Sequence, residues 1–248
     1  MSQDGLPSVF SSADLYLRVR EKEGRLYSDD VVAHLPSVSN GHPLANEWRA
    51  RAASASRLTR YLSAKPKPLC ILDLGCGNGW LSNLLYISGQ RVVGMDQNRY
   101  ELKQAARIFP QSSGLFFLDA NIFSAPFVSG YFDVIILASV IQYFHKLPDL
   151  LSVLMKYLKP SGEIHIMDSP LYADTELKEA LQRSQHYYAS LGFPEMGEHY
   201  FHHCVSDLKM FNAQNLYQPQ ALLPHLMRRL GRVDSPFPWY VIRKQGVE

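Results

Sequence analysis

The sequence predicts an α/β protein built on a doubly wound, mostly parallel sheet of about seven strands, with helices on both faces and a helical cap at the N-terminus. Short apolar runs alternate with segments of helical periodicity between residues 70 and 167. Strands that alternate with helices require right-handed crossovers and parallel pairing. The chain has 248 residues, of which 46% are hydrophobic, and this length is about one and a half typical domain lengths. One large domain with an additional segment is therefore expected.

The first part of this alternation is a strand, a tight turn and a helix, followed by a second strand and helix. Cys70 to Leu74 is a compact apolar run that ends in a glycine cluster, and the leucines within 81–85 then fall at helical spacing. Arg91 to Met95 has the pattern of a second strand. Asn98 is placed to cap a helix, and Leu102 begins the apolar stripe of that helix.

Three further strands are predicted at residues 115–118, 132–138 and 163–167. The run from Phe132 to Ala138 is apolar after Asp133, which is typical of a central strand covered on both faces. Pro148 is expected to open a helix whose inward face includes residues up to Leu158. Residues 160–162 should then turn the chain into the strand that begins at residue 163.

The two ends of the chain are less regular. Helical spacing is present over residues 44–62, 175–191 and 220–230, and a last strand is expected over Phe237 to Arg243. We expect residues 1–64 to form an N-terminal helical extension or lid. Residues 65–248 should form the main domain, with an insertion around 172–216 that covers the substrate.

Composition excludes several classes of partner. The formal net charge of +2 produces no strong field for a polyanion or an anionic membrane. Cys70, Cys76 and Cys204 are too few for a disulfide framework. No basic segment followed by an apolar run begins the chain, and the longest apolar run is far shorter than a membrane span. We therefore expect a cytoplasmic protein with no membrane partner and no strong signal for a nucleic acid, and its oligomeric state stays open.

The glycine cluster lies where open parallel sheets bind their ligands, at the carboxyl end of a strand. It reads Asp73-Leu74-Gly75-Cys76-Gly77-Asn78-Gly79. A dinucleotide site prefers its third glycine at position 80, which is Trp80 here. Asp73 would also repel a pyrophosphate, but it suits a ligand that carries a positive group. S-adenosylmethionine (SAM), with an ammonium and a sulfonium, is such a ligand.

This segment resembles motif I of the class I, Rossmann-like, SAM-dependent methyltransferases, and the companion motifs follow in order. Asp96, 19 positions after Gly77, ends the second strand where the family places an acid that binds the ribose hydroxyls. Asp119 ends the third strand, where the family's acid meets the adenine amino group. The resemblance covers Lys67 to Asp168. It implies SAM as cofactor and S-adenosylhomocysteine as product.

The expected cofactor site follows from these motifs. A capping role for Asp73 and an ordinary helix-preceding role for Asp96 are the alternatives when each acid is taken alone. Arg51 is expected to pair with the ligand's carboxylate. The predicted cofactor-binding residues are Asp73, Gly75, Cys76, Gly77, Gly79, Asp96, Gln97, Asp119, Ala120, Asn121, Ala138, Ser139, Tyr143 and Arg51.

The expected reaction is in-line transfer of the methyl group to an oxygen, nitrogen or carbon atom of a small molecule. The methyl group of SAM is already activated, so the protein mainly has to align the acceptor atom with it. No catalytic residue is assigned. The segment Leu137-Ala138-Ser139-Val140 does not match the motif of enzymes that methylate nucleobase amino groups. The predicted substrate-pocket residues are Tyr27, Trp48, His145, Tyr172, His199, His202 and His203.

Three alternatives remain beside this interpretation: methylation of RNA or protein, a SAM-binding protein without turnover, and NAD-dependent reduction, which the glycine register disfavours. A metal site is not expected. His and Cys residues are close together between His199 and Cys204, but their spacing matches no zinc pattern.

Overall fold

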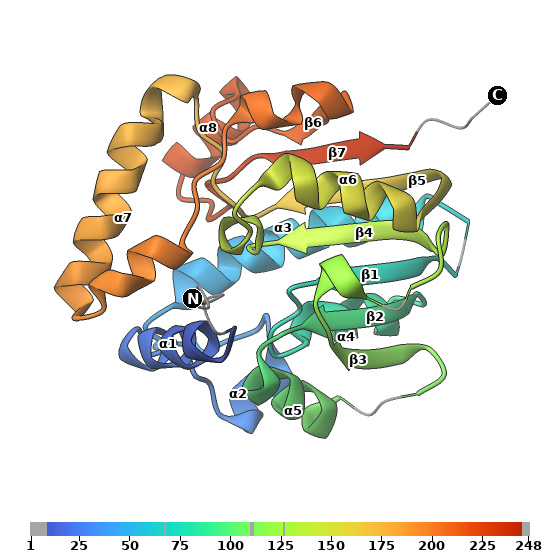
Figure 1. Cartoon of the computed structure of the whole chain (residues 1–248), viewed down its shortest axis with the longest axis horizontal. Coiled ribbons are helices and arrows are strands. Elements are labelled where there is room, and N and C mark those ends of the chain that lie inside the picture. The colour runs from blue at the N-terminus through green and yellow to red at the C-terminus, as the bar shows by residue number, and fades with distance from the viewer. Residues whose placement is uncertain (1–8, 67, 110–111, 126, 245–248) are drawn as a thin grey trace, which may run out of the picture.

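The computed structural model describes residues 9–66, 68–109, 112–125 and 127–244, and its centre is one seven-stranded sheet (Figure 1). Residues 1–8 of the expected N-terminal extension, and Lys67 at the start of the resemblance, lie outside the described residues. The strand order is β3-β2-β1-β4-β5-β7-β6, with β7 antiparallel to both of its neighbours and the others parallel. The predicted fold class is confirmed. The strands are β1 Cys70–Leu74, β2 Arg91–Asp96, β3 Leu115–Asp119, β4 Phe132–Ala138, β5 Leu158–Met167, β6 Gln214–Tyr217 and β7 Trp239–Arg243.

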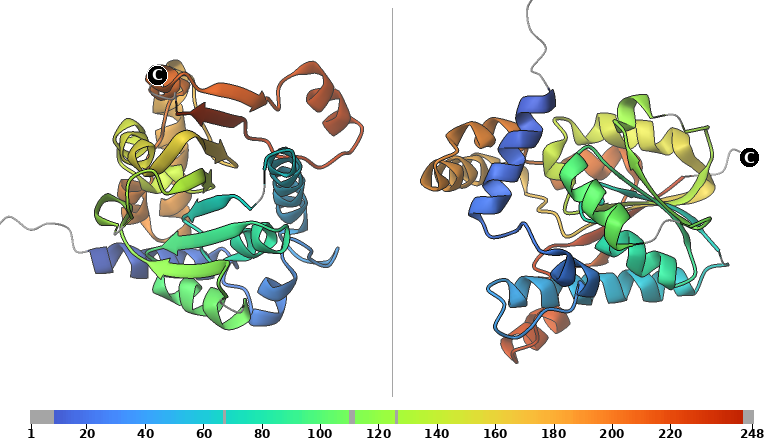
Figure 2. Two further views of the ribbon diagram at one scale, coloured as in Figure 1. Left: turned by 90° about the vertical axis from the view of Figure 1, so that its right-hand side faces the viewer. Right: turned by 90° about the horizontal axis from the view of Figure 1, so that it is seen from below.

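The helices form layers on the two faces of this sheet. α3 and α4 pack through Leu58 and Leu85 on one face, and α6 packs through Leu151 on the other (Figure 2). α1 and α7 lie beyond the end to which β4 points (Figure 1). The α-helices are α1 Val9–Lys22, α2 Asp29–His34, α3 Ala45–Ser63, α4 Trp80–Ile87, α5 Arg99–Ile108, α6 Leu147–Tyr157, α7 Leu177–Leu191 and α8 Leu222–Arg229. The 3-10 helices are η1 Ile122–Ser124, η2 Ile141–Tyr143, η3 Asp174–Glu176, η4 Pro194–His199 and η5 Val205–Phe211.

Local sequence signals account for the elements that position the site. The Asn98 side chain accepts hydrogen bonds from the amides of Tyr100 and Glu101, so it caps α5 as predicted. β4 lies between β1 and β5, and Val134 to Leu137 have at most 1% of their surface exposed. The prediction of a central fourth strand is confirmed. The strand order reverses between β1 and β4, and this reversal makes their carboxyl ends the switch point of the sheet.

The predicted boundary between α6 and the fifth strand was wrong. Leu158 was expected on the inward face of the helix, but α6 ends at Tyr157, and Leu158 already pairs with Phe132 of β4. The pairing then shifts before it resumes between Glu163 and Val134. Ser161, in the left-handed region with φ +62°, lies within this shift. The turn expected at residues 160–162 is therefore an irregularity inside β5. Leu158 is buried against β4, so β5 begins at Leu158, earlier in the chain than residue 163.

Candidate functional site

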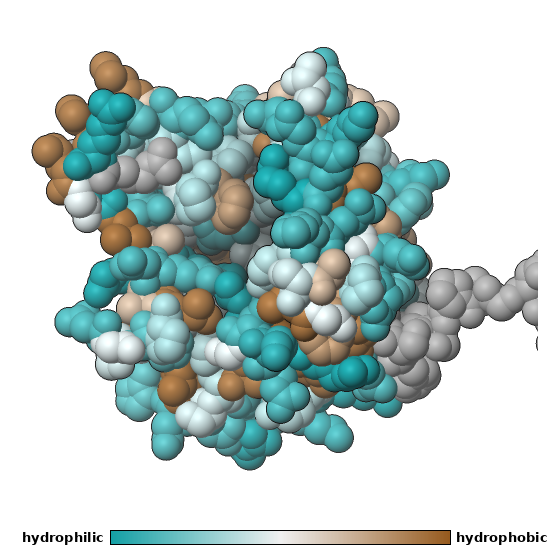
Figure 3. Space-filling view, turned by 90° about the vertical axis from the view of Figure 1, so that its left-hand side faces the viewer, coloured by the Kyte–Doolittle hydropathy of each residue, from teal (hydrophilic) through white to brown (hydrophobic). Residues whose placement is uncertain are grey.

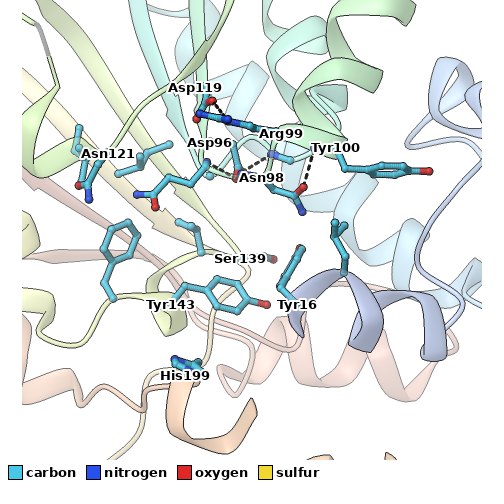
Figure 4. Close-up of a pocket in the computed structure, with 18 of the residues that line it drawn as sticks. Tyr16, Asp96, Asn98, Arg99, Tyr100, Asp119, Asn121, Ser139, Tyr143 and His199 are labelled. Carbon is cyan, nitrogen blue, oxygen red and sulfur yellow. Dashed lines mark hydrogen bonds and ion pairs between the residues drawn. The ribbon is translucent and has the colours of Figure 1, made fainter. Parts of the chain in front are cut away.

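A cavity of about 630 Å³ lies at the carboxyl ends of β1, β2, β3 and β4. This volume is within the range of small-molecule sites. One wall is formed by residues at the ends of the strands, including Asp96 and Asp119. Tyr16 of α1 and His199 of η4 lie on the opposite side, with Ser139 between the two groups (Figure 4). Residues from the ends of four strands therefore meet residues from both less regular parts of the chain.

The wall formed by the strand ends is rich in hydrogen-bonding groups. The Asp96 carboxylate accepts from the amides of Gly77 at 2.8 Å, Gln97 at 2.7 Å and Asn98 at 2.8 Å. Burial raises the pKa of Asp96 although these amides stabilise its charged form. An ion pair of 2.6 Å joins Asp119 to the Nε of Arg99 (Figure 4). The cavity thus presents carboxylates that the backbone and a neighbouring cation already hold in position.

A second, smaller cavity of about 30 Å³ lies on the other side of the glycine turn. Gly75 lines both cavities. The end of β4 is shared in the same way, because Ala138 lines the smaller cavity and Ser139 the larger one. A ligand that crosses Gly75 would occupy both spaces at the switch point of the sheet.

Two acids and one arginine line the smaller cavity. Asp73 is 2% exposed and accepts a 2.6 Å hydrogen bond from Ser82, and burial raises its pKa to about 6. Asp168, whose pKa is also raised by burial, accepts from the hydroxyls of Ser54 at 2.7 Å and Ser235 at 2.8 Å. Arg51 supplies the opposite charge. Carboxylates beside a guanidinium match a ligand end that carries both an ammonium and a carboxylate.

The side of the large cavity nearer to α1 is aromatic. Tyr16 and Tyr143 meet edge to face, with 5.5 Å between ring centroids. Arg20 donates from Nη2 to the Tyr143 hydroxyl at 3.1 Å, and its guanidinium lies 4.9 Å from the centre of the Tyr16 ring. These contacts fix α1 over the cavity. Phe144, Met196, His199 and Phe201 complete this aromatic side.

Most of the predicted cofactor residues meet at these two cavities. Gly75, Gly77, Asp96, Gln97, Asp119, Ala120, Asn121, Ser139 and Tyr143 line the large one. Asp73, Cys76, Ala138 and Arg51 line the small one. Gly79 lines neither cavity, and a Cβ built on it would lie 2.7 Å from the ring of Phe117. This glycine instead allows the start of α4 to approach the sheet closely.

The predicted substrate residues are dispersed, and of these seven only His199 lines the large cavity. Trp48 of α3 donates to the hydroxyl of Tyr27, which lies between α1 and α2, at 3.1 Å. His145 packs on the ring of Phe201. These three side chains are used in packing.

The other three predicted substrate residues also lie outside the cavities. Tyr172 and His202 pack on each other, with 5.6 Å between ring centroids. A ring nitrogen of His203 lies 2.9 Å from the carbonyl oxygen of Ile141.

Several cavity residues could not be found from the sequence. Tyr16 lies in the predicted helical extension of residues 1–64, but no helical spacing marks α1 itself, and no feature of the sequence distinguishes Arg99 from other residues in the first turn of α5. Phe201 lies within the aromatic segment before Cys204, where the sequence prediction names only the histidines. Among the described residues, no three His, Cys, Asp or Glu side chains group in a way that could hold a metal ion. No helix in the described part of the chain is long and apolar enough to cross a membrane.

Comparisons with known proteins agree with this geometry. The family model described as a methyltransferase domain matches residues 72–166. The bifunctional biotin biosynthesis protein BioHC of Cellvibrio japonicus is 30% identical over 135 residues, which are 54% of this chain and 26% of that protein. A malonyl-[acyl-carrier protein] O-methyltransferase of Enterobacter lignolyticus is 30% identical over 139 residues, 54% of this chain and 51% of that protein. The chain thus spans between a quarter and about half of these relatives.

The fold as a whole is also shared with solved structures. A geranyl diphosphate C-methyltransferase of Streptomyces coelicolor, crystallised with Mg²⁺, geranyl diphosphate and S-adenosylhomocysteine, superposes with a TM-score of 0.61 at 16% identity. The superposition covers 97% of this chain and 100% of that one. At this identity the likeness concerns the fold. Residues 72–166 therefore match a methyltransferase domain, and the strand order and this superposition show that the chain has the class I, Rossmann-like fold.

Proposed function

We propose that this protein transfers a methyl group from SAM to a small, uncharged and largely apolar or aromatic acceptor by in-line displacement. The observation that carries the proposal is the meeting of the two cavities at Gly75, at the switch point of the sheet. The larger space suits the adenosine and the acceptor, and the smaller one suits the methionine end. SAM supplies the activated methyl group.

The acids at the strand ends and the two arginines of the site then have binding roles. Asp96 accepts hydrogen bonds from the ribose hydroxyls, and Asp119 accepts from the adenine amino group, with Arg99 holding its carboxylate in place. Asp73 and Asp168 face the ammonium, and Arg51 faces the carboxylate of the methionine end. Asp73 and Asp168 are buried with raised pKa values, so a cationic ligand group between them replaces lost solvation.

The acceptor class follows from the charges around the large cavity. Arg99 is the only Lys or Arg among the described residues that line it, and Asp119 already pairs with this guanidinium. Asp14, Asp96 and Asp119 make the lining acidic overall. An acceptor with a free carboxylate, such as the malonyl group named for one relative, would meet repulsion there.

The residues that line the large cavity also support the prediction that residues 1–64 and the insertion around 172–216 cover the substrate. Tyr16 lies in the N-terminal extension of residues 1–64, and Met196 and His199 lie in the insertion around 172–216. His199 is the titratable group of this aromatic side best suited to accept a proton if the acceptor is a hydroxyl. With a carbon or an already deprotonated acceptor, positioning alone is enough.

The test separates the cofactor from the acceptor. Thermal unfolding is followed with SAM, S-adenosylhomocysteine and NAD, and we expect stabilisation by the first two compounds only. The protein is then incubated with labelled SAM and with neutral aromatic and carboxylate-bearing extracts of cell metabolites. Labelled products from the neutral fraction support the acceptor class. Stabilisation without any product would indicate a SAM-binding protein without turnover, and labelled products confined to the carboxylate fraction would contradict the acceptor class.

A further inference from the structure

The helix α8 projects from the body of the protein and carries exposed leucines. Leu222, Leu226 and Leu230 have 85%, 49% and 74% of their surface exposed. Because successive helical residues turn by about 100°, Leu222 and Leu226 lie within about 40° of arc on one side of α8, and Leu230 directly follows the last residue of this helix. Figure 2 shows α8 standing away from the sheet and the other helices. In Figure 3, hydrophobic side chains protrude at the corner of the molecule where Figures 1 and 2 place this helix.

The segment around α8 is also strongly basic. Residues 218–233 contain Arg228, Arg229 and Arg232 and no Asp or Glu. Arg229 and Arg232 are exposed. The net charge of +2 for the whole chain conceals this local cluster, and for that reason no membrane partner was expected from the composition. Exposed leucines beside arginines are typical of helices that lie in a membrane interface.

The segments that flank α8 are firmly attached to the rest of the protein. Arg57 of α3 pairs with Asp234 at 2.6 Å and lies 3.9 Å from the centre of the Tyr217 ring. The Tyr217 hydroxyl donates to the carbonyl oxygen of Ser235 at 3.1 Å. These contacts join the chain just before α8 to the chain just after it. The segments on either side of α8 are therefore held together and attached to the body of the protein, and the helix projects from this fixed position.

We propose that α8 and the residues that directly follow it form a membrane-surface contact: Leu222, Leu226 and Leu230 insert into the interface of an anionic bilayer while Arg229 and Arg232 bind lipid phosphates. A convex helix with separated leucines suits a deformable lipid surface, since a protein partner would need a groove to receive it. Contact with the same helix of a second copy would bring two basic segments together without acids between them. Charge complementarity thus favours the anionic lipid surface.

The experiment uses the full chain and vesicle flotation. Vesicles of phosphatidylcholine alone are compared with vesicles that also contain phosphatidylglycerol. We expect flotation with the anionic vesicles and much weaker flotation with the neutral ones. The double variant Leu226→Ser/Leu230→Ser should reduce the partition coefficient by about tenfold or more, because it removes most of the insertable apolar surface. Ile87→Ser, which removes an exposed apolar side chain at 67% exposure elsewhere, is the matched control and should bind as the parent does.

A second variant tests the charges. Arg229→Glu/Arg232→Glu should abolish the preference for phosphatidylglycerol, since each arginine near an anionic surface contributes about fivefold to partitioning. Thermal unfolding of both variants should match the parent, because the changed side chains are exposed. The proposal is overturned if the parent does not float with anionic vesicles or if the leucine variant binds equally well. It is also overturned if light scattering shows a parent dimer that becomes a monomer in the leucine variant without any lipid binding.

Discussion

Gly75 and Val140 are packed so closely that no other residue fits at the glycine. A Cβ built on Gly75 would lie 2.2 Å from Cγ2 of Val140 and 2.8 Å from its Cβ. Gly75 also has φ +75°, a conformation that side chains disfavour. Since Gly75 lines both cavities, the contact sets how closely the turn after β1 approaches the loop after β4. A ligand that spans the two cavities passes over this contact.

Gly75→Ala should therefore disturb both folding and ligand binding. We expect a loss of about 1–3 kcal/mol in the free energy of unfolding from overpacking, measured by urea denaturation. SAM affinity, measured by calorimetry, should fall at least tenfold in the fraction that remains folded. Gly89→Ala is the matched control, because Gly89 has φ +88° but nothing within 4 Å of a built Cβ. If both variants lose the same stability, backbone strain alone explains the effect and the contact with Val140 does not matter.

Asp96→Ala should weaken SAM binding by roughly tenfold to a hundredfold, because hydrogen bonds to a charged group contribute about 1.5–3 kcal/mol. The three amides that Asp96 accepts from would lose their partner in the same variant. Asp96→Asn keeps an acceptor for some of them and is the comparison for a purely structural role. Unchanged SAM affinity in Asp96→Ala by calorimetry would remove this residue from the site.

The affinity for SAM should depend on pH through Asp73. Burial raises the pKa of this carboxyl to about 6, and a nearby ligand ammonium favours its charged form. At low pH, SAM binding then releases a proton from Asp73. The affinity for SAM is therefore highest above about pH 6 and falls as the pH decreases through that value. Calorimetry between pH 5 and 8 measures this dependence.

A second carboxyl near the cavity titrates in the same range and must be separated from the first. Burial raises the pKa of Glu101 to about 7. Asp73→Asn should flatten the pH dependence of SAM affinity, whereas Glu101→Gln should retain it. The reverse pattern would place the ligand ammonium away from Asp73.

Arg20 should slow the release of the cofactor product, because it holds α1 over the cavity through the Tyr143 hydroxyl. Removal of one such hydrogen bond in Arg20→Met should weaken S-adenosylhomocysteine binding by about two- to tenfold, mainly through faster dissociation. Stopped-flow dissociation and hydrogen exchange of α1 report the effect. Arg18→Met is the control, since Arg18 belongs to the same helix but stacks on Phe193, which does not line either cavity. Equal dissociation rates for the two variants would contradict a closing role for Arg20.

The central part of the fold could be predicted because local signals and burial agree there. The strands Cys70–Leu74 and Phe132–Ala138 were predicted with the bounds that the structure shows. Both are compact apolar runs, and the glycine cluster marks the point where the first of them ends. The strand β6, Gln214–Tyr217, was not predicted, because it is a short polar edge strand whose residues are mostly exposed. Its pairing with β7 comes from tertiary contacts that no local pattern encodes.

The site could be predicted on the side of the strand ends and only in part elsewhere. Asp96 and Asp119 follow from their positions at the ends of strands, because parallel strands bring their carboxyl ends to one edge. Tyr16 and Met196 reach the cavity only through the packing of α1 and η4, which depends on contacts far apart in the sequence. Trp48, although aromatic and close to the motif in sequence, is used to pack α3 and is 4% exposed. Residue type alone does not distinguish these cases.

The carboxylate of Asp168 accepts hydrogen bonds from two segments far apart in the sequence. One comes from the hydroxyl of Ser54, before the first strand, and the other from the hydroxyl of Ser235, before the last strand. The segment matched by the family model, residues 72–166, contains none of these three side chains. A fragment trimmed to that segment would thus be missing the partners that shape the smaller cavity. Minimal versions of this catalytic scaffold must retain both flanking regions, and mutations in either flank are able to alter ligand selection without touching the glycine turn.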